Sequence, residues 1–384
     1  MNKWYFLFLL GFLLTGCREA ARAEKAGTAK TEKNWIPKYA RGFEAAYSSD
    51  GVVYLTIKNP WPGAERDFRY ALVPREKKSE FTPPNDSLDG VIGTPVQRIV
   101  LTSTTHVPAL ETLGMEDRLV GFPGLDYISS TRTRRRIEAG AIQELGANEQ
   151  LNTERVLSLN PDVIVGFGVS GAPSSYQALE ASGVPIVYNG DWMEEDPLGK
   201  AEWLFFFGLL LEEERAAKLA FEKVEMAYRE AKALAAGASE SPTVLSGALY
   251  RDVWYLPAGG SWAARFISDA NARYLWQDTP GNGSLSLSLE SVLEKGAEAD
   301  FWVAPSQFTS YAEMARSNQH YRQFQAFQNK KVYTYALSQG PGTGMLYYER
   351  GPGRPDLILK DLIYWLHPGL LPDYSPVFFK PLRP

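Results

Sequence analysis

Cysteine and histidine are scarce in this chain of 384 residues, which contains one cysteine, Cys17, and three histidines. A single cysteine excludes an internal disulfide, so the folded part must be stabilised by burial of apolar surface. The histidines, His106, His320 and His367, are too few and too scattered for a zinc or manganese site. We therefore expect neither a metal site made by protein side chains nor a resident cofactor.

Long apolar runs are also missing after the first residues. A helix needs ~20 apolar residues to cross a bilayer, and the nearest candidate, residues 203–211, is far too short. The net charge of −5 gives no reason to expect nucleic acid as a partner. Aromatic residues, by contrast, are plentiful, with 10 Trp, 20 Tyr and 19 Phe. Such a surplus suits a protein that binds a bulky, partly apolar ligand.

The first residues have the layout of an export signal. A basic start is followed by the apolar residues 4–14 and then by Leu14-Thr15-Gly16-Cys17. The last four residues resemble the lipobox, in which a cysteine receives diacylglycerol and becomes the new N-terminus. We expect a signal peptide at 1–16, lipid on Cys17 and a flexible tether at 17–33, rich in Ala, Lys and Glu. The alternatives are an ordinary signal peptide and a half-buried helix.

The folded part begins with a β-rich segment, residues 34–94. Strands are expected at 42–47, 52–58 and 68–74, with the turn sequence Ser49-Asp50-Gly51 between the first two. Residues 81–93 contain two prolines and several polar residues, and they are expected to form a loop.

Two α/β units follow. In residues 95–211 the expected strands are 98–101, 119–122, 162–166 and 185–188, and helices are expected at 153–159 and 174–182. In residues 238–384 the expected strands are 243–246, 253–256, 300–304 and 331–335, and helices are expected at 262–270, 290–295 and 355–366. Strands that alternate with helices predict parallel sheets covered on both faces.

A long helix is expected between these units, in residues 212–237. It opens with three acids, its apolar residues recur at helical spacing, and Gly237 ends it. With 1.5 Å per residue the helix would reach ~37 Å, the width of a whole domain. Residues 197–211 are expected to form a separate apolar helix.

Four passages resemble the ABC-transporter substrate-binding proteins that serve iron-siderophores, haem and cobalamin. They are residues 95–114 (PVQRIVLTSTTHVPALETLG), 151–166 (LNTERVLSLNPDVIVG), 286–304 (SLSLESVLEKGAEADFWVA) and the long helix. The resemblance implies an α/β fold of two Rossmann-like lobes joined by a single rigid helix, the class III periplasmic binding protein. The β-rich segment is an addition to it.

The resemblance also implies a function and partners. The expected protein is a monomeric solute receptor, lipid-anchored to a bacterial membrane and facing the periplasm or cell exterior. It binds a metal chelate in the cleft between the lobes and delivers it to an ABC permease driven by an ATPase. In this class one glutamate on each lobe pairs with permease arginines, and the matching positions are Glu154 and Glu290. Each is also an acid at a helix N-terminus, which the helix dipole favours.

Candidate ligand contacts lie in loops at the carboxyl ends of the expected strands, where α/β lobes bind ligands. They are Thr104, Thr105, His106, Tyr127, Phe167, Trp192, Arg251, Trp254 and Trp262. Residues 306–308 and 338–348 are expected at the same edge. Aromatic side chains offer flat apolar area, and Arg251 can pair with an anionic chelate. For His106 an axial-ligand role and a polar role at a helix N-terminus both stay open.

These features favour a ferric siderophore as the ligand, with haem and cobalamin as alternatives. An exported hydrolase is the competing class. The chain has no Gly-x-Ser-x-Gly elbow and no thiol beyond Cys17. We therefore expect no enzymatic activity and assign no catalytic residue.

Overall fold

A computed structural model describes residues 31–84 and 87–384. The predicted signal peptide, Cys17 and residues 17–30 of the predicted tether lie outside the described residues. Within the described part of the chain, no helix combines the length and hydropathy that a membrane span requires.

The β-rich segment forms a five-stranded sheet in the order β1-β2-β3-β4-β5. Its strands are β1 (Thr31–Trp35), β2 (Phe43–Ser48), β3 (Val53–Ile57), β4 (Phe68–Pro74) and β5 (Gly90–Thr94). β1 to β4 pair antiparallel, and β5 joins β4 in parallel. The expectation of a loop at 81–93 is wrong at its end, because the short run Val91-Ile92 pairs along β4. β1 also begins three residues before the predicted boundary at 34.

The first lobe, residues 95–211, contains a parallel sheet in the order β12-β11-β6-β7-β8. Its strands are β6 (Ile99–Leu101), β7 (Leu119–Phe122), β8 (Gln143–Glu144), β11 (Val163–Gly166) and β12 (Ile186–Tyr188), and β9 (Gly146–Ala147) pairs with β10 (Gln150–Leu151). Its helices include α1 (Val107–Thr112), α2 (Thr131–Glu138), α3 (Thr153–Leu159) and α4 (Ser174–Ala181). Every residue of β11 is buried, as its continuous apolar sequence requires.

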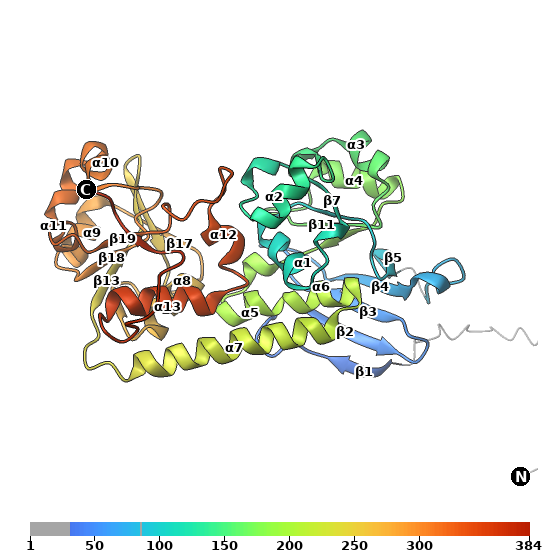
Figure 1. Ribbon diagram of the computed structural model, residues 1–384, viewed down its shortest axis with the longest axis horizontal. Coiled ribbons are helices and arrows are strands. Elements are labelled where there is room, and N and C mark those ends of the chain that lie inside the picture. Colours follow the sequence, from blue (N-terminus) through green and yellow to red (C-terminus); the bar gives the residue numbers. More distant parts are fainter. Residues whose placement is uncertain (1–30, 85–86) are drawn as a thin grey trace, which may run out of the picture.

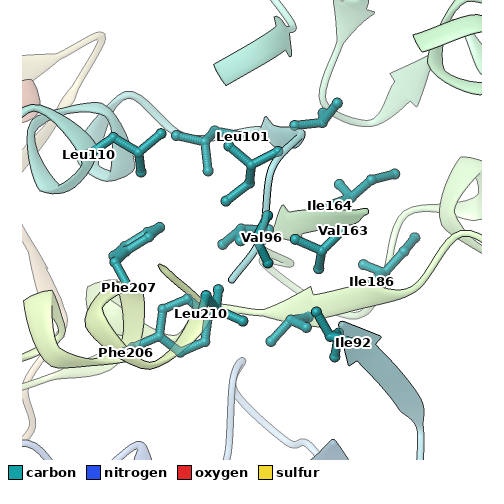
Figure 2. Packing of buried hydrophobic residues seen from close by; sticks show 14 of the residues in the cluster. Ile92, Val96, Leu101, Leu110, Val163, Ile164, Ile186, Phe206, Phe207 and Leu210 are labelled. Carbon is teal, nitrogen blue, oxygen red and sulfur yellow. The ribbon is translucent and has the colours of Figure 1, made fainter. Parts of the chain in front are cut away.

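The β-rich segment and the first lobe share one hydrophobic core. Figure 2 shows Ile92 of β5 in the same cluster as Ile164 and Ile186 of the parallel sheet and Leu210. At the other end of the sheet, the ring of Trp35 stacks on Phe205 at 3.9 Å. The five-stranded sheet is therefore packed into the first lobe rather than attached by a linker.

Three consecutive helices follow the first lobe's sheet: α5 (Pro197–Glu202), α6 (Leu204–Leu211) and α7 (Glu214–Ala236). The single helix expected at 197–211 is broken at Trp203. α7 has 23 residues and begins after Glu212, whose positive φ of 58° ends α6. α7 packs against α6 and against α13 (Pro355–Leu366) of the second lobe, and it runs beneath both lobes (Figure 1).

The second lobe, residues 238–384, has two sheets. The strands of the larger sheet are β13 (Thr243–Ser246), β16 (Arg273–Tyr274), β18 (Phe301–Val303), β19 (Val332–Thr334) and β20 (Lys380–Pro381). Their order is β16-β13-β18-β19-β20, and all pair in parallel except the edge strand β20. The smaller is antiparallel and consists of β14 (Ala248–Tyr250), β15 (Val253–Pro257) and β17 (Ser284–Leu287). The remaining helices are α8 (Trp262–Asp269), α9 (Leu289–Gly296), α10 (Tyr311–Ser317), α11 (Gln325–Gln328) and α12 (Leu346–Arg350).

The same polar contact holds the strands together in both lobes. Asp162, just before β11, accepts the backbone N–H of Arg98 at 3.0 Å, next to the start of β6. Asp300, just before β18, accepts the backbone N–H of Thr243 at 2.8 Å, at the start of β13. These hydrogen bonds lower the pKa of both carboxyls, while burial acts in the opposite direction. Each carboxylate therefore fixes the register of a parallel strand pair.

Candidate ligand cleft between the lobes

The carboxyl ends of strands from both lobes face a common cavity of about 710 Å³. We call it the aromatic chamber. Its wall consists of residues 192–195, 246–248, 255–257, 261–263 and 282–284 with Pro62, Tyr250, Ala304, Ser306, Tyr335, Tyr347 and Tyr348. Seven of these residues are Trp or Tyr. Its volume falls within the ~300–1,000 Å³ typical of small-molecule sites.

Several of these rings have faces open to the chamber. Tyr250, Tyr255 and Tyr348 are exposed, and Trp192 is 36% exposed. Trp262 stacks on Tyr347 with 6.1 Å between ring centroids. The arrangement offers a flat ligand apolar area from several directions, with phenol and indole groups at its edges.

A second cavity of about 730 Å³ adjoins the first and lies against α1, α6, α7 and residues 339–354. We call it the basic chamber because its wall carries Arg132, Lys200, Arg350 and Arg354 against the two acids Glu111 and Asp191. Arg354 forms a two-point ion pair with Asp356, at 2.7 and 2.8 Å. Arg350 is half-buried and makes no hydrogen bond or ion pair with any described residue. Its guanidinium is therefore available to an anionic ligand.

A smaller cavity of about 180 Å³, which we call the passage, shares Asp191 and Lys200 with the basic chamber and Trp192 and Trp262 with the aromatic chamber. The buried ammonium of Lys200 donates hydrogen bonds at 3.0 Å to the backbone carbonyls of Asp191 and Trp192. It also lies 5.4 Å from the ring centroid of Trp262. Burial lowers the pKa of Lys200, and the neighbouring carboxylates of Asp191 and Glu194 oppose that shift.

Three contacts between side chains or backbone hold the lobes together around these cavities. Glu349, in α12, accepts the backbone N–H groups of Ser129 at 2.5 Å and Ser130 at 2.9 Å. The backbone N–H of Thr343 donates to the carbonyl of Asp126 at 2.8 Å. On the wall of the aromatic chamber, Asn282 donates to Glu195 at 2.6 Å. The second lobe thus contacts the first beside both chambers.

Glycines make one of these contacts possible. Gly340, Gly342 and Gly344 lie so close to the backbone of residues 126–129 that a Cβ atom at any of them would overlap it. Residues 338–348, expected at the cleft, therefore partly serve to connect the lobes.

The structure brings three of the predicted ligand contacts to the cavities. Thr105 lines the basic chamber and the passage, and Trp192 and Trp262 line the passage and the aromatic chamber. Four other predicted residues are not on the chamber walls: Thr104, Tyr127, Phe167 and Arg251. Arg251 occupies the exposed turn between β14 and β15, with its guanidinium 5.4 Å from the ring centroid of Tyr250.

Two predicted contacts are core residues, and their assignment to the ligand is wrong. Trp254 is 0% exposed; its ring stacks on Trp302 at 5.3 Å, and its indole N–H donates to the carbonyl of Ser246. His106 is 1% exposed and lies 5.6 Å from the ring of Phe207. Burial lowers the pKa of His106, with Asp191 and Asn189 opposing the shift.

The sequence of residues 99–336 matches the family model described as periplasmic binding protein, which spans more than half of the chain. The chain belongs to the periplasmic binding protein family. Proteins of this family are substrate-binding receptors of ABC importers and work with a permease and an ATPase. The expected class III α/β fold is thereby confirmed.

Individual proteins are also similar to this chain. An uncharacterized lipoprotein of Methanocaldococcus jannaschii is 24% identical over 371 residues, which cover 91% of this chain and 86% of the relative. A periplasmic heme binding protein from Pseudomonas aeruginosa superposes with a TM-score of 0.55 at 21% identity, covering 75% of this chain and 99% of that one. A possible iron-binding periplasmic protein from Staphylococcus epidermidis gives a TM-score of 0.55 at 17% identity, covering 71% of this chain and all of that one. The two structures show that the fold is shared.

The two glutamates predicted to contact a permease occupy equivalent places in the two lobes of this periplasmic binding protein. Glu154 lies in the first turn of α3 and Glu290 in the first turn of α9, and both are exposed. Hydrogen bonds from the backbone and from Ser288 lower the pKa of Glu290. Both residues are thus at the surface, one on each lobe, and Figure 1 shows their helices α3 and α9 in different lobes.

Sequence reasoning missed several residues of the cavities. Three of them, Tyr250, Tyr255 and Tyr335, lie in strands or at strand ends. The sequence does not specify which side of these strands faces the chamber. Lys200 and Arg350 come from helices rather than from strand-end loops. A signal for Lys200 was present, because it is a lone cation in the otherwise apolar stretch Pro197-Leu198-Gly199-Lys200-Ala201.

Proposed function

We propose that the protein is an extracytoplasmic receptor that captures a metal chelate, first of all a ferric siderophore, and delivers it to an ABC permease. The observation that supports this most is the pair of adjoining chambers between the lobes, one walled by seven aromatic residues and the other by four cations. A chelate wraps its metal in an organic shell, so the receptor recognises that shell and needs no metal ligands of its own. The role is binding, and no residue is assigned to catalysis.

The two chambers suit different parts of such a ligand. The rings of Trp192, Trp262 and Tyr255 present flat apolar area to the aromatic groups of a chelate. The unpaired guanidinium of Arg350 is placed to donate hydrogen bonds to a carboxylate or a catecholate oxygen. Because the passage shares wall residues with each chamber, we infer that one extended ligand contacts both. The charge of Arg350, which has no ion-pair partner among the described residues, favours an anionic ligand over a neutral one.

Haem is the second candidate, and one contact favours it. The phenol groups of Tyr335 and Tyr348 lie 2.8 Å apart at the wall of the aromatic chamber, where a planar macrocycle would find an oxygen ligand for its iron. Burial and the neighbouring Tyr348 raise the pKa of Tyr335, so that phenol stays protonated and binds iron weakly. Tyr348, which is exposed, is therefore the phenol for this role. Cobalamin, large and nearly neutral, fits the basic chamber less well.

Tryptophan fluorescence quenching tests the proposal with ferrichrome, ferric enterobactin, haemin and cyanocobalamin as probes. We expect micromolar or tighter binding of a ferric siderophore. A charge-assisted hydrogen bond contributes ~1.5–3 kcal/mol, so Arg350→Ala should weaken binding of an anionic probe by about tenfold or more.

The matched control is Arg135→Ala. Arg135 is an exposed arginine of α2 that lines neither chamber, and its removal should leave the affinity unchanged. Tight binding of cyanocobalamin alone, insensitive to Arg350→Ala, would overturn the proposed ligand class.

A further inference from the structure

The loop between β3 and β4 lies on the first lobe's ligand-facing edge. Two glycines of the first lobe show how closely the loop approaches this edge. A Cβ atom on Gly168, just after β11, would be 3.1 Å from Cε3 of Trp61. A Cβ atom on Gly190, just after β12, would be 3.2 Å from Cα of Pro60. These positions lie at the carboxyl ends of adjacent parallel strands, where α/β lobes bind their ligands.

Trp61 fixes the loop to this edge. Its half-buried ring meets Tyr188, the last residue of β12, edge to face at 5.1 Å, and lies 5.3 Å from Phe68 at the start of β4. Pro60 and Pro62 on either side have fixed φ angles, which restrict the loop further. Because β3 and β4 share the core of the first lobe, both ends of the loop are held as well.

The loop changes which residues reach the ligand cavity. Phe167 and the exposed Val169 follow β11, yet neither lines a chamber. Pro62 does line the aromatic chamber, together with Trp192 and Glu195 of the first lobe. The β-rich segment therefore supplies part of the chamber wall through Pro62, whereas the residues after β11 supply none of it.

We propose that Pro62, held in place by Pro60 and Trp61, is a specificity-determining wall of the aromatic chamber, which limits the size of the ligand on the side of the first lobe. The inference rests on the proposed function and adds to it a role for the β-rich segment. A ligand as large as cobalamin would have to displace the loop. A siderophore or a haem can lie between the second lobe's aromatic rings and Trp192 without doing so.

Binding by calorimetry of full-length protein tests this inference with ferrichrome, haemin and cyanocobalamin as probes. In one variant two glycines replace residues 60–64, which removes the wall. We expect its affinity for cyanocobalamin to rise at least tenfold above that of the wild type. In a second variant, Pro62→Trp, an exposed residue gains a bulky ring inside the chamber. We expect this variant to lose at least tenfold in affinity for whichever of ferrichrome and haemin the wild type binds.

Glu65→Ala is the control in the same loop, because Glu65 is exposed and does not line the chamber. It should leave every affinity unchanged. Melting temperatures close to the wild type's would show that the variants fold. Unchanged affinities for all three probes in Pro62→Trp and in the shortened variant would overturn the role of the loop alone. A wild type that binds none of these probes and no ferric enterobactin would overturn the proposed ligand class and, with it, this inference.

Discussion

The carboxylate of Glu349, in the second lobe, accepts a hydrogen bond from the backbone N–H of Ser129, in the first lobe, at 2.5 Å. Only 1% of Glu349 is exposed, and a second bond from the N–H of Ser130 completes the contact. Since the two partners are 220 positions apart in the chain, this is a tertiary contact that bridges the cleft. Its integrity should affect both stability and the distance between the lobes.

Removing this carboxylate should weaken the fold. Glu349→Ala leaves two backbone N–H groups without their acceptor, and an unsatisfied buried donor costs ~1–3 kcal/mol. We expect the free energy of unfolding, measured in urea, to fall by about that amount. Glu298→Ala, at an exposed glutamate of the same lobe, should change it by less than about 0.5 kcal/mol. Equal effects of the two changes would contradict the importance of the contact.

The same carboxyl should make stability depend on pH. Burial raises the pKa of Glu349 above its ordinary value of 4.5, and Glu111 adds to the shift, while the N–H groups of Ser129 and Ser130 oppose it. The folded state then binds the proton more tightly than the unfolded state, so this stabilisation is present below the unfolded pKa and is lost as pH rises through the folded pKa. Glu349→Gln cannot titrate. The free energy of unfolding of the wild type minus that of the variant should therefore decrease as the pH rises above the ordinary value of 4.5. An increase would contradict the assigned direction.

A second buried carboxylate attaches the β-rich segment to the helices. Glu202 of α5 accepts the backbone N–H groups of Lys38 at 2.8 Å, Tyr39 at 2.7 Å and Ala40 at 2.9 Å. Glu202→Ala leaves all three without an acceptor, and we expect a loss of about 3 kcal/mol in the free energy of unfolding. The measurement is again urea unfolding, with the exposed Glu298→Ala as control. A loss below about 0.5 kcal/mol would show that water replaces the carboxylate.

The docking prediction concerns uptake and not ligand binding. Glu154 and Glu290 are exposed, one on each lobe, and neither lines a chamber. Reversing both to Lys should abolish uptake, because like charges would meet at the arginines expected on the permease, while ligand affinity changes by no more than a few-fold. The double variant Glu138→Lys and Glu298→Lys reverses one exposed acid per lobe as a control. Normal transport by the Glu154 and Glu290 variant would exclude this docking surface.

The anchor prediction concerns Cys17, outside the described residues. Cys17→Ala should leave an uncleaved precursor or release soluble protein, because the lipid-modified cysteine is absent. Fractionation of cells with an antibody against the protein measures the outcome. If the variant still reached membranes as the processed form, the prediction of a lipid anchor would be wrong.

The buried central strands and the long helix α7 were predictable because their signals are local. β11 and β18 are short apolar runs that follow Asp162 and Asp300, and both are buried as their composition requires. α7 follows from apolar residues at helical spacing. β5 was not predictable, since its two apolar residues pair along β4 only in the folded structure.

The side to which each side chain points was harder to predict than the strands and helices themselves. In β15 Trp254 and Tyr255 are adjacent, so one must face the core and the other the chamber. Both are aromatic, and the sequence alone does not distinguish them. Pairing with β14 and β17 decides the matter by placing Trp254 inside, against Trp302. Arg350 shows the same limit, because its position depends on how α12 packs between the lobes (Figure 1).

Native mass spectrometry of the protein purified from its own cells tests the proposed ligand class most directly. The account predicts a bound species whose mass exceeds that of the polypeptide by a chelate containing iron, recognisable from its isotope pattern. Once mild denaturation has removed the bound species, added ferric siderophore should again quench the tryptophan fluorescence. A bound organic molecule that contains no metal, such as a sugar or a peptide, would contradict the account.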